Sequence, residues 1–138
     1  MKSIQILLIE DNEGDILLTT EALSDSRMCN RISVLKDGAA AIALFSTDLP
    51  VDDIPDLVLL DVNLPKKSGH EVLRFIKHSE KYKHIPVIML TTSSSDKDIM
   101  LSYRNYSNCY ITKPIEFSDF MVAISKIEDF WINIVTIP

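Results

Sequence analysis

Acidic, hydroxyl and lysine side chains stand directly after short apolar runs at four points of the sequence. These side chains belong to Glu10, Asp11, Asp61, Thr91 and Lys113. Two unit charges about 5 Å apart repel by roughly 3 kcal/mol at an effective dielectric constant near 20, so carboxylates brought together here need a compensating charge. A hard divalent cation supplies that charge, and Mg2+ suits a few carboxylates together with phosphate oxygens and water. The lysine would add a fixed positive charge.

The same residue types are those needed for phosphoryl transfer to a carboxylate. One carboxylate attacks phosphorus, a metal ion and a lysine neutralise the transferring group, and a hydroxyl donates to one of its oxygens. An acidic pair after a strand also occurs as a helix cap, and Thr-Thr or Lys-Pro in that place also occurs as a turn or loop. The chemistry is therefore indicated by the agreement of four positions, and not by any one of them.

Short apolar runs predict the strands that must position these groups. The runs cover residues 4–9, 57–60 and 87–90, and weaker candidates cover residues 32–35 and 109–112. Continuous apolar runs of this length are typical of strands that are buried on both faces of a parallel sheet.

Helical spacing of apolar residues fills the intervals between these strands. Segment 15–23 is a good helix former, and Ser95 with Asp98 forms a capping-box pattern that opens another helix. Apolar residues lie three or four positions apart in the remaining intervals. The residues with this spacing are Leu18, Ala22, Ala41, Leu44, Phe45, Val72, Leu73, Ile76, Phe120, Ile124, Ile127 and Trp131.

The alternation of strand and helix, five times over, predicts an α/β fold. Right-handed crossovers would place helices on both faces of a parallel sheet. Ligands of such sheets lie at the carboxyl ends of the strands. Because every polar group named above follows a strand directly, all of them are expected at the same edge.

Composition favours one globular domain in the cytoplasm. The chain has 138 residues, of which 46% are apolar and 25% charged. A formal net charge of −6 argues against nucleic-acid binding. No stretch approaches the roughly 20 apolar residues that span a bilayer, and the acids at positions 10 and 11 interrupt any signal-peptide core. Cys29 and Cys109 form no CxxC pair and are expected to pack as small apolar side chains.

Two further features are expected at the surface. Residues 47–56 read as a polar, solvated loop. The three histidines, His70, His78 and His84, have no metal-ligand spacing and lie in polar surroundings.

Four segments together resemble the receiver domain of two-component response regulators. The segments are Leu8-Ile9-Glu10-Asp11-Asn12, residues 56–65 with Gly69 following, residues 85–92, and Tyr110-Ile111-Thr112-Lys113-Pro114. The resemblance covers nearly the whole chain. It implies a doubly wound, flavodoxin-like fold with a five-stranded parallel sheet in the order 2-1-3-4-5 and five helices. Residues 1–138 would then form a single receiver domain without an output domain.

The resemblance also implies a phosphoacceptor and a metal site. Asp61 would accept a phosphoryl group from the phosphohistidine of a histidine kinase. Glu10 and Asp11 would hold Mg2+ together with Asp61, and the backbone carbonyl of Asn63 would complete the protein ligands. Such a protein is a signalling switch that catalyses only its own phosphorylation and dephosphorylation.

Four further residues match the parts that respond to phosphorylation in this family. Thr91 would be the switch hydroxyl, and Lys113 would pair with the phosphoryl group. Tyr110 matches an aromatic residue that moves between outward and inward positions. Pro114 matches a proline that is usually preceded by a cis peptide bond.

A closer resemblance is to the small response regulators paired with cyanobacterial and bacterial phytochromes. It rests on segment 61–65, the acidic loop before the third strand, and the ending at residues 130–138. The implied partner is a phytochrome-like histidine kinase. Apolar residues at 134–137 predict a homodimer through the fourth helix, the fifth strand and the C-terminal segment, unless that segment folds back on its own domain.

Three alternatives carry different expectations. A phosphatase of the haloacid dehalogenase type would have a second aspartate two residues after its nucleophile, but Asn63 stands there and cannot act as a general acid. A flavodoxin-like binding protein would need a phosphate loop after the first strand, where the sequence is acidic. A degenerate receiver that is never phosphorylated would be expected to lack part of the set, which is complete here.

Overall fold

Five strands and four helices make up the part of the chain that the structure describes. This structure is a computed structural model, and it describes residues 4–24, 30–91 and 109–125. The elements are β1 (Ile4–Ile9), α1 (Glu13–Ser24), β2 (Asn30–Leu35), α2 (Gly38–Phe45), the 3-10 turn η1 (Val51–Asp53), β3 (Leu57–Asp61), α3 (Gly69–Lys77), β4 (Val87–Thr91), β5 (Cys109–Thr112) and α5 (Phe117–Ser125).

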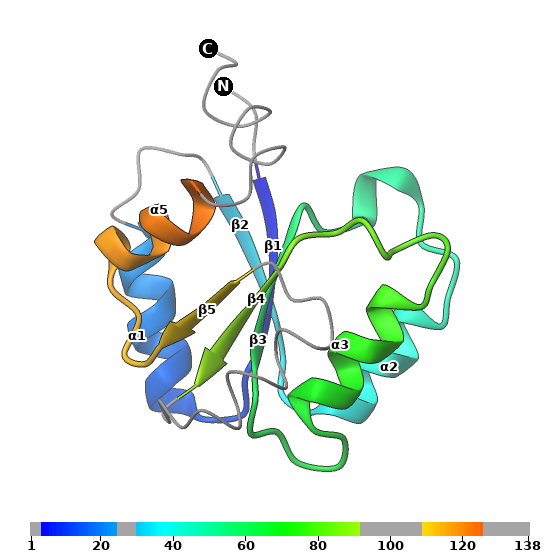
Figure 1. Cartoon of the computed structure of the whole chain (residues 1–138), viewed down its shortest axis with the longest axis horizontal. Coiled ribbons are helices and arrows are strands. Elements are labelled where there is room, and N and C mark those ends of the chain that lie inside the picture. The colour runs from blue at the N-terminus through cyan, green and yellow to red at the C-terminus, as the bar shows by residue number, and fades with distance from the viewer. Residues whose placement is uncertain (1–3, 25–29, 92–108, 126–138) are drawn as a thin grey trace.

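The strands form one parallel sheet in the order β2-β1-β3-β4-β5, which confirms the predicted α/β fold and strand order. Helices α1 and α5 cover one face of the sheet, and α2 and α3 cover the other (Figure 1). The helix expected from Ser95, and residues 127 and 131 of the last apolar stripe, lie outside the described residues. No helix in the described ranges has both the length and the apolar character that crossing a membrane requires.

Each central strand sends alternate side chains into two separate cores. In β3, Leu57 and Leu59 pack on the α1 and α5 side, whereas Val58 and Leu60 pack on the α2 and α3 side. All four are fully buried. A strand buried on both faces needs apolar residues at every position, because successive side chains point to opposite faces. This explains the continuous apolar run, and it leaves Asp61 as the first polar residue of the strand.

Polar caps fix where α2 and α3 begin. Asp37 accepts a hydrogen bond from the backbone amide of Ala40, and Ser68 forms a capping box with Glu71. Gly69 opens α3 in close contact with the end of β3, where a Cβ atom would lie only 2.2 Å from the backbone oxygen of Asp61. A residue without a Cβ is therefore required for α3 to start directly beside Asp61.

Three sequence expectations need correction. In α1, Ala22 packs against the core and Thr19 and Leu23 are buried, whereas Leu18 is 48% exposed. His70 is half-buried and both of its ring nitrogens are shielded from solvent, because it faces the space between α2 and α3. The loop at 47–56 is only partly solvated, since Leu49 and Ile54 pack against the core. The side chains of both cysteines lie outside the described part of the chain.

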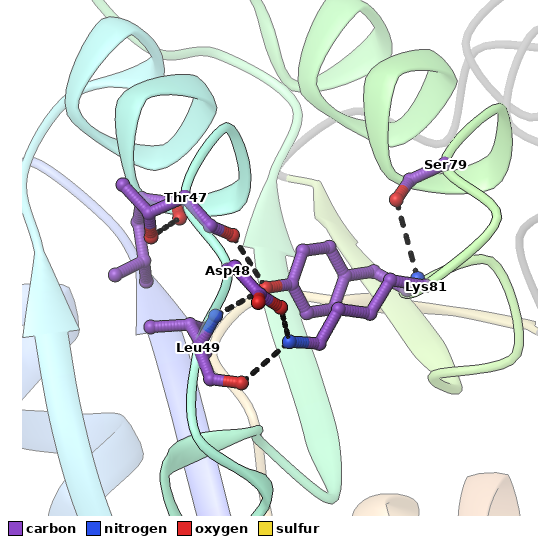
Figure 2. A network of polar contacts seen from close by, with 7 residues as sticks. Thr47, Asp48, Leu49, Ser79 and Lys81 are labelled. Atoms are coloured by element: carbon purple, nitrogen blue, oxygen red, sulfur yellow. Dashed lines mark hydrogen bonds and ion pairs between the residues drawn. The ribbon is translucent and has the colours of Figure 1, made fainter.

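A closed polar network ties that loop to the segment before β4. Within this Tyr82 network, the Tyr82 hydroxyl donates to the backbone oxygen of Thr47 at 2.6 Å and accepts from the amide of Leu49 at 2.9 Å. Figure 2 shows Lys81 beside Asp48, to which its Nζ donates, and its second bond to the Leu49 oxygen at 2.6 Å. The Tyr82 ring is 2% exposed and contacts Phe45 edge-on. The network thus anchors the 47–49 segment to the core.

Candidate functional site

Backbone pairing carries the ladder of the sheet past the strand ends and so fixes the polar residues there. The amide of Glu10 donates to the Leu35 oxygen at 2.9 Å. The amide of Lys113 donates to the Thr91 oxygen at 2.8 Å. Because the strands are parallel, their carboxyl ends meet at one edge. The structure brings together Glu10, Asp61, Thr91 and Lys113 there, as the sequence predicted.

Three carboxylates gather at this edge. One oxygen each from Glu10, Asp11 and Asp61 lies within 4.8 Å of the other two. Glu10 is fully buried and Asp61 is 4% exposed, whereas Asp11 faces solvent. We call these residues, together with Lys113 and Asp15, the strand-end cluster. The arrangement of two buried acids and one exposed acid gives oxygen ligands with an open side.

Lys113 is the cation of the strand-end cluster. Its side chain is 7% exposed, and its Nζ lies 3.2 Å from Asp61 Oδ2 and 2.9 Å from Asp15 Oδ2, and also contacts Glu10. Burial by itself lowers the pKa of Lys113, but the hydrogen bonds to Glu10 and Asp15 and the nearby charges outweigh it. The net pKa is raised, so the ammonium group stays charged.

Glu10 is the acid of the cluster whose pKa is raised. Burial, followed by the hydrogen bond and charge of Asp61, raises the pKa of Glu10 to about 7, although Lys113 opposes the shift. The cluster also has four carboxylates and one lysine among the described residues, so the ammonium does not neutralise all of its acids. Oxygen donors with surplus negative charge are what a hard divalent cation requires, so the residues present fit such an ion.

Asn63, Thr91 and Tyr110 occupy different positions near the ends of the strands. The backbone amide of Asn63 donates to Asp61 Oδ1 at 3.1 Å. Thr91 is 2% exposed at the end of β4, and Tyr110 is half-buried on β5 on the α2 and α3 side. The peptide bond between Lys113 and Pro114 is cis, as the family resemblance implied. The metal-binding role of the Asn63 carbonyl stays a prediction.

Asp15 is the site residue that sequence reasoning missed. It lies in the first turn of α1, and its backbone amide donates to Asn12 Oδ1 at 2.9 Å. Asn12 in turn donates its amide to Glu10 Oε2 at 3.2 Å. Nothing in the spacing distinguished Asp15 from Glu13, which points instead to exposed Lys36. Only the position of Lys113, 98 residues further along the chain, reveals the difference.

A cavity elsewhere on the surface does not contain this chemistry. It measures about 910 Å³ and lies between α2 and α3, against Ile42, Phe45 and Phe75. None of the strand-end acids lines it. The buried charged groups, including Glu10 with its raised pKa, lie at the strand ends. That edge of the sheet is therefore the better candidate for the functional site.

A family model for the response regulator receiver domain matches residues 6–125. The chain belongs to this family. Among its relatives, this receiver domain is 42% identical over 135 residues to the response regulator Rcp1 of Synechocystis sp. (strain ATCC 27184 / PCC 6803 / Kazusa), covering 96% of this chain and 92% of Rcp1.

Solved structures of similar proteins agree with the receiver fold. The Mn2+-bound form of Rcp1 superposes with a TM-score of 0.75 at 41% identity, covering 98% of this chain and 99% of that one. The bacteriophytochrome response regulator AtBRR gives 0.80 at 39% identity, covering 95% and 96%. The phosphorylated cyanobacterial phytochrome response regulator RcpA gives 0.76 at 41% identity, covering 95% of each chain. The predicted likeness to phytochrome response regulators is thereby confirmed.

Proposed function

We propose that this receiver domain is a phosphorylation switch in which Asp61 accepts a phosphoryl group from a histidine kinase. The observation that carries the proposal is the place of Asp61 itself. It is buried at the end of β3, 3.2 Å from the ammonium of Lys113 and in one group with two further carboxylates. A nucleophile held beside a fixed cation and an open set of oxygen ligands is suited to phosphoryl transfer.

The transfer step is a substitution at phosphorus. A carboxylate oxygen of Asp61 forms the new bond to phosphorus while the bond from phosphorus to the kinase imidazole nitrogen breaks. The electron pair of that bond stays on the imidazole. Glu10, Asp11, Asp61 and the Asn63 carbonyl would hold Mg2+, which when bound neutralises negative charge on the phosphoryl oxygens. Lys113 supplies a fixed positive charge on the other side of Asp61.

The response to phosphorylation is assigned to Thr91 and Tyr110. The Thr91 hydroxyl donates to a phosphoryl oxygen, and Tyr110, on the neighbouring strand, shifts between its two arrangements. Thr91 is the last residue of β4, and Tyr110 lies on β5. These two strands pair directly. A ligand that binds one arrangement better shifts the population towards it, so no new fold is required.

The kinase partner is proposed from the relatives, and the cellular location is proposed from the sequence. The kinase is phytochrome-like, and the protein acts in the cytoplasm as a signalling protein, without turnover of a separate substrate. Residues 1–138 as one receiver domain also stay a prediction. A homodimer would use the fourth helix, β5 and the C-terminal segment, but that helix and that segment lie outside the described residues. Light scattering on the chain and on a version ending at Asp129 tests it, and identical monomer masses would exclude the dimer.

Phosphotransfer to a matched pair of variants tests the acceptor. Asp61→Asn removes the nucleophile. Asp56→Asn makes the same change just before the other end of β3, where Asp56 accepts a hydrogen bond from the Gln5 amide at 2.9 Å. With Mg2+ and a histidine kinase that carries a labelled phosphoryl group, we expect full uptake of the label by the wild type and by Asp56→Asn. We expect no uptake by Asp61→Asn. Labelling of Asp61→Asn at the wild-type level would rule out the assignment.

A further inference from the structure

Lys113 has three carboxylate partners among the described residues. Its Nζ contacts Glu10, lies 3.2 Å from Asp61 Oδ2 and donates to Asp15 Oδ2 at 2.9 Å. A lysine ammonium carries three hydrogens and accepts no hydrogen bond. A new partner, such as a phosphoryl oxygen, would therefore compete with these three carboxylates for the ammonium.

The three partners differ in what a metal ion would do to them. Glu10 and Asp61 belong to the group whose oxygens lie within 4.8 Å of one another, and Asp15 does not. A cation held by that group would compete with the ammonium for the negative charge of Glu10 and Asp61. Asp15 is thus the one carboxylate partner of Lys113, among the described residues, that the ammonium would not share with the metal ion.

We propose that Asp15 is a positioning residue that holds the Lys113 ammonium beside Asp61 while the metal site is filled. The inference rests on the proposed phosphoacceptor function and adds a residue to it. Without Asp15 the ammonium would share both of its remaining carboxylates with the metal ion, and the flexible lysine side chain would be held less firmly. With Asp15 it points at the position where charge develops on the transferring group.

The start of α1 holds Asp15 firmly in this role. Its backbone amide is bound by the side chain of Asn12, and the amide of Asn12 is bound by Glu10 at the end of β1. The Asp15 side chain is 29% exposed, so it lies at the rim of the site next to the buried lysine. The first turn of α1 is therefore coupled to the strand end on one side and to Lys113 on the other.

The matched control lies two residues away. Glu13 also lies in the first turn of α1, but its partner is Lys36, and both side chains of that pair are exposed. Asp15→Asn and Glu13→Gln each remove one negative charge from the same helix end, so any effect through the helix dipole is shared. Only Asp15→Asn removes a partner of Lys113.

The test measures the rate of phosphoryl uptake from acetyl phosphate at saturating Mg2+. We expect a loss of about tenfold for Asp15→Asn, the effect of roughly 1.4 kcal/mol on a barrier, and no change for Glu13→Gln. Asp15→Glu, which restores the charge, should recover part of the rate. On a Lys113→Met background Asp15→Asn should cause no further loss, because there is no ammonium left to position.

The outcomes separate this inference from the proposed function. A wild-type protein that takes up no phosphate would overturn the function itself. Wild-type uptake with an Asp15→Asn rate equal to or above that of Glu13→Gln would overturn the positioning role alone. Additive losses in the Asp15→Asn, Lys113→Met pair would overturn it too, since they would show that Asp15 acts independently of the lysine.

Discussion

Two polar clusters that each contain a lysine lie at opposite ends of the same strands. The Tyr82 network lies on the segments that precede β3 and β4, and the strand-end cluster follows them. In the network, the tyrosine hydroxyl has a backbone acceptor and a backbone donor, and Lys81 pairs with one acid. In the strand-end cluster, Lys113 stands beside three carboxylates, and Asp11 adds a fourth negative charge.

The difference teaches how stability and function divide along one sheet. Buried polar groups that are fully paired hold loops to a core. Buried acids that outnumber their cations destabilise the fold unless a ligand brings more positive charge. Burial first, and then the neighbouring Asp61, raise the pKa of Glu10 in this cluster. We therefore expect changes at the strand-end cluster to alter phosphorylation and pH dependence, and changes in the Tyr82 network to alter stability alone.

The largest stability effect is expected for Lys113→Met. This change keeps the apolar stem and leaves Glu10 and Asp61 buried without their lysine. Breaking a buried ion pair costs about 3–5 kcal/mol, so urea denaturation near pH 8 without metal should show a loss of that order. Near pH 5.5 the loss should be smaller, because Glu10 can take a proton. Equal losses of stability at the two pH values would show that the effect of Lys113 does not depend on the ionisation of Glu10.

The next effect is a pH dependence that Glu10 imposes on the metal-free protein. The pKa of Glu10 is about 7 in the folded state, against 4.5 for an unperturbed glutamate. The folded state therefore binds a proton that the unfolded state releases, and the free energy of unfolding falls as pH rises from about 4.5 to about 7. The whole effect is on the order of 3 kcal/mol. Glu10→Gln should be the more stable protein near pH 8, and this pH-dependent difference should disappear as the pH falls to about 4.

Metal binding sharpens the same comparison. A divalent ion needs deprotonated carboxylates, so Mg2+ affinity measured by calorimetry should rise with pH through the pKa of Glu10. Glu10→Gln should bind more weakly and lose this pH dependence. A wild-type affinity that stays constant between pH 6 and about 8 would show that Glu10 does not titrate with the metal.

A smaller loss is expected for Tyr82→Phe. The ring remains, but the Thr47 oxygen and the Leu49 amide lose their partner. Such a loss costs about 1–2 kcal/mol. Thermal denaturation should detect it, while the rate of phosphoryl uptake should equal that of the wild type. A slower uptake would mean that the two clusters are not independent.

The smallest effect is expected for Lys81→Met. Although its hydrogen bond to Asp48 raises the pKa of Lys81, the pair is exposed, with the Asp48 side chain 91% accessible. Exposed pairs contribute little because solvent and salt screen them. The melting temperature should stay within error of the wild type. A drop as large as that of Tyr82→Phe would show that Lys81 holds the loop through its bond to Leu49.

The fold and most of the site could be predicted from local patterns. Strands buried on both faces appear as apolar runs, and the first polar residue after each run lies at the carboxyl edge. That logic predicts Glu10, Asp61, Thr91 and Lys113 at one edge of the sheet, where the structure has them. The boundaries were close too, since β5 was predicted at residues 109–112 and observed at Cys109–Thr112.

What the sequence could not supply were contacts between distant segments. Asp15 and Glu13 look alike in a first helical turn, and only tertiary packing brings one of them to Lys113. The burial of His70 depends likewise on how α2 packs against α3, not on its polar neighbours in the sequence. The inward face of α1 differed from the expected one because Thr19 and Leu23, not Leu18, face the sheet.

Peptide mapping of the phosphorylated protein tests the central claim most directly. The wild type is incubated with acetyl phosphate, once with Mg2+ and once with a chelator, and digested for mass spectrometry. We predict one phosphoryl group on the peptide that contains Asp61, present with Mg2+ and absent with the chelator. A phosphoryl group on any other peptide, or equal uptake in the chelator, would contradict the account.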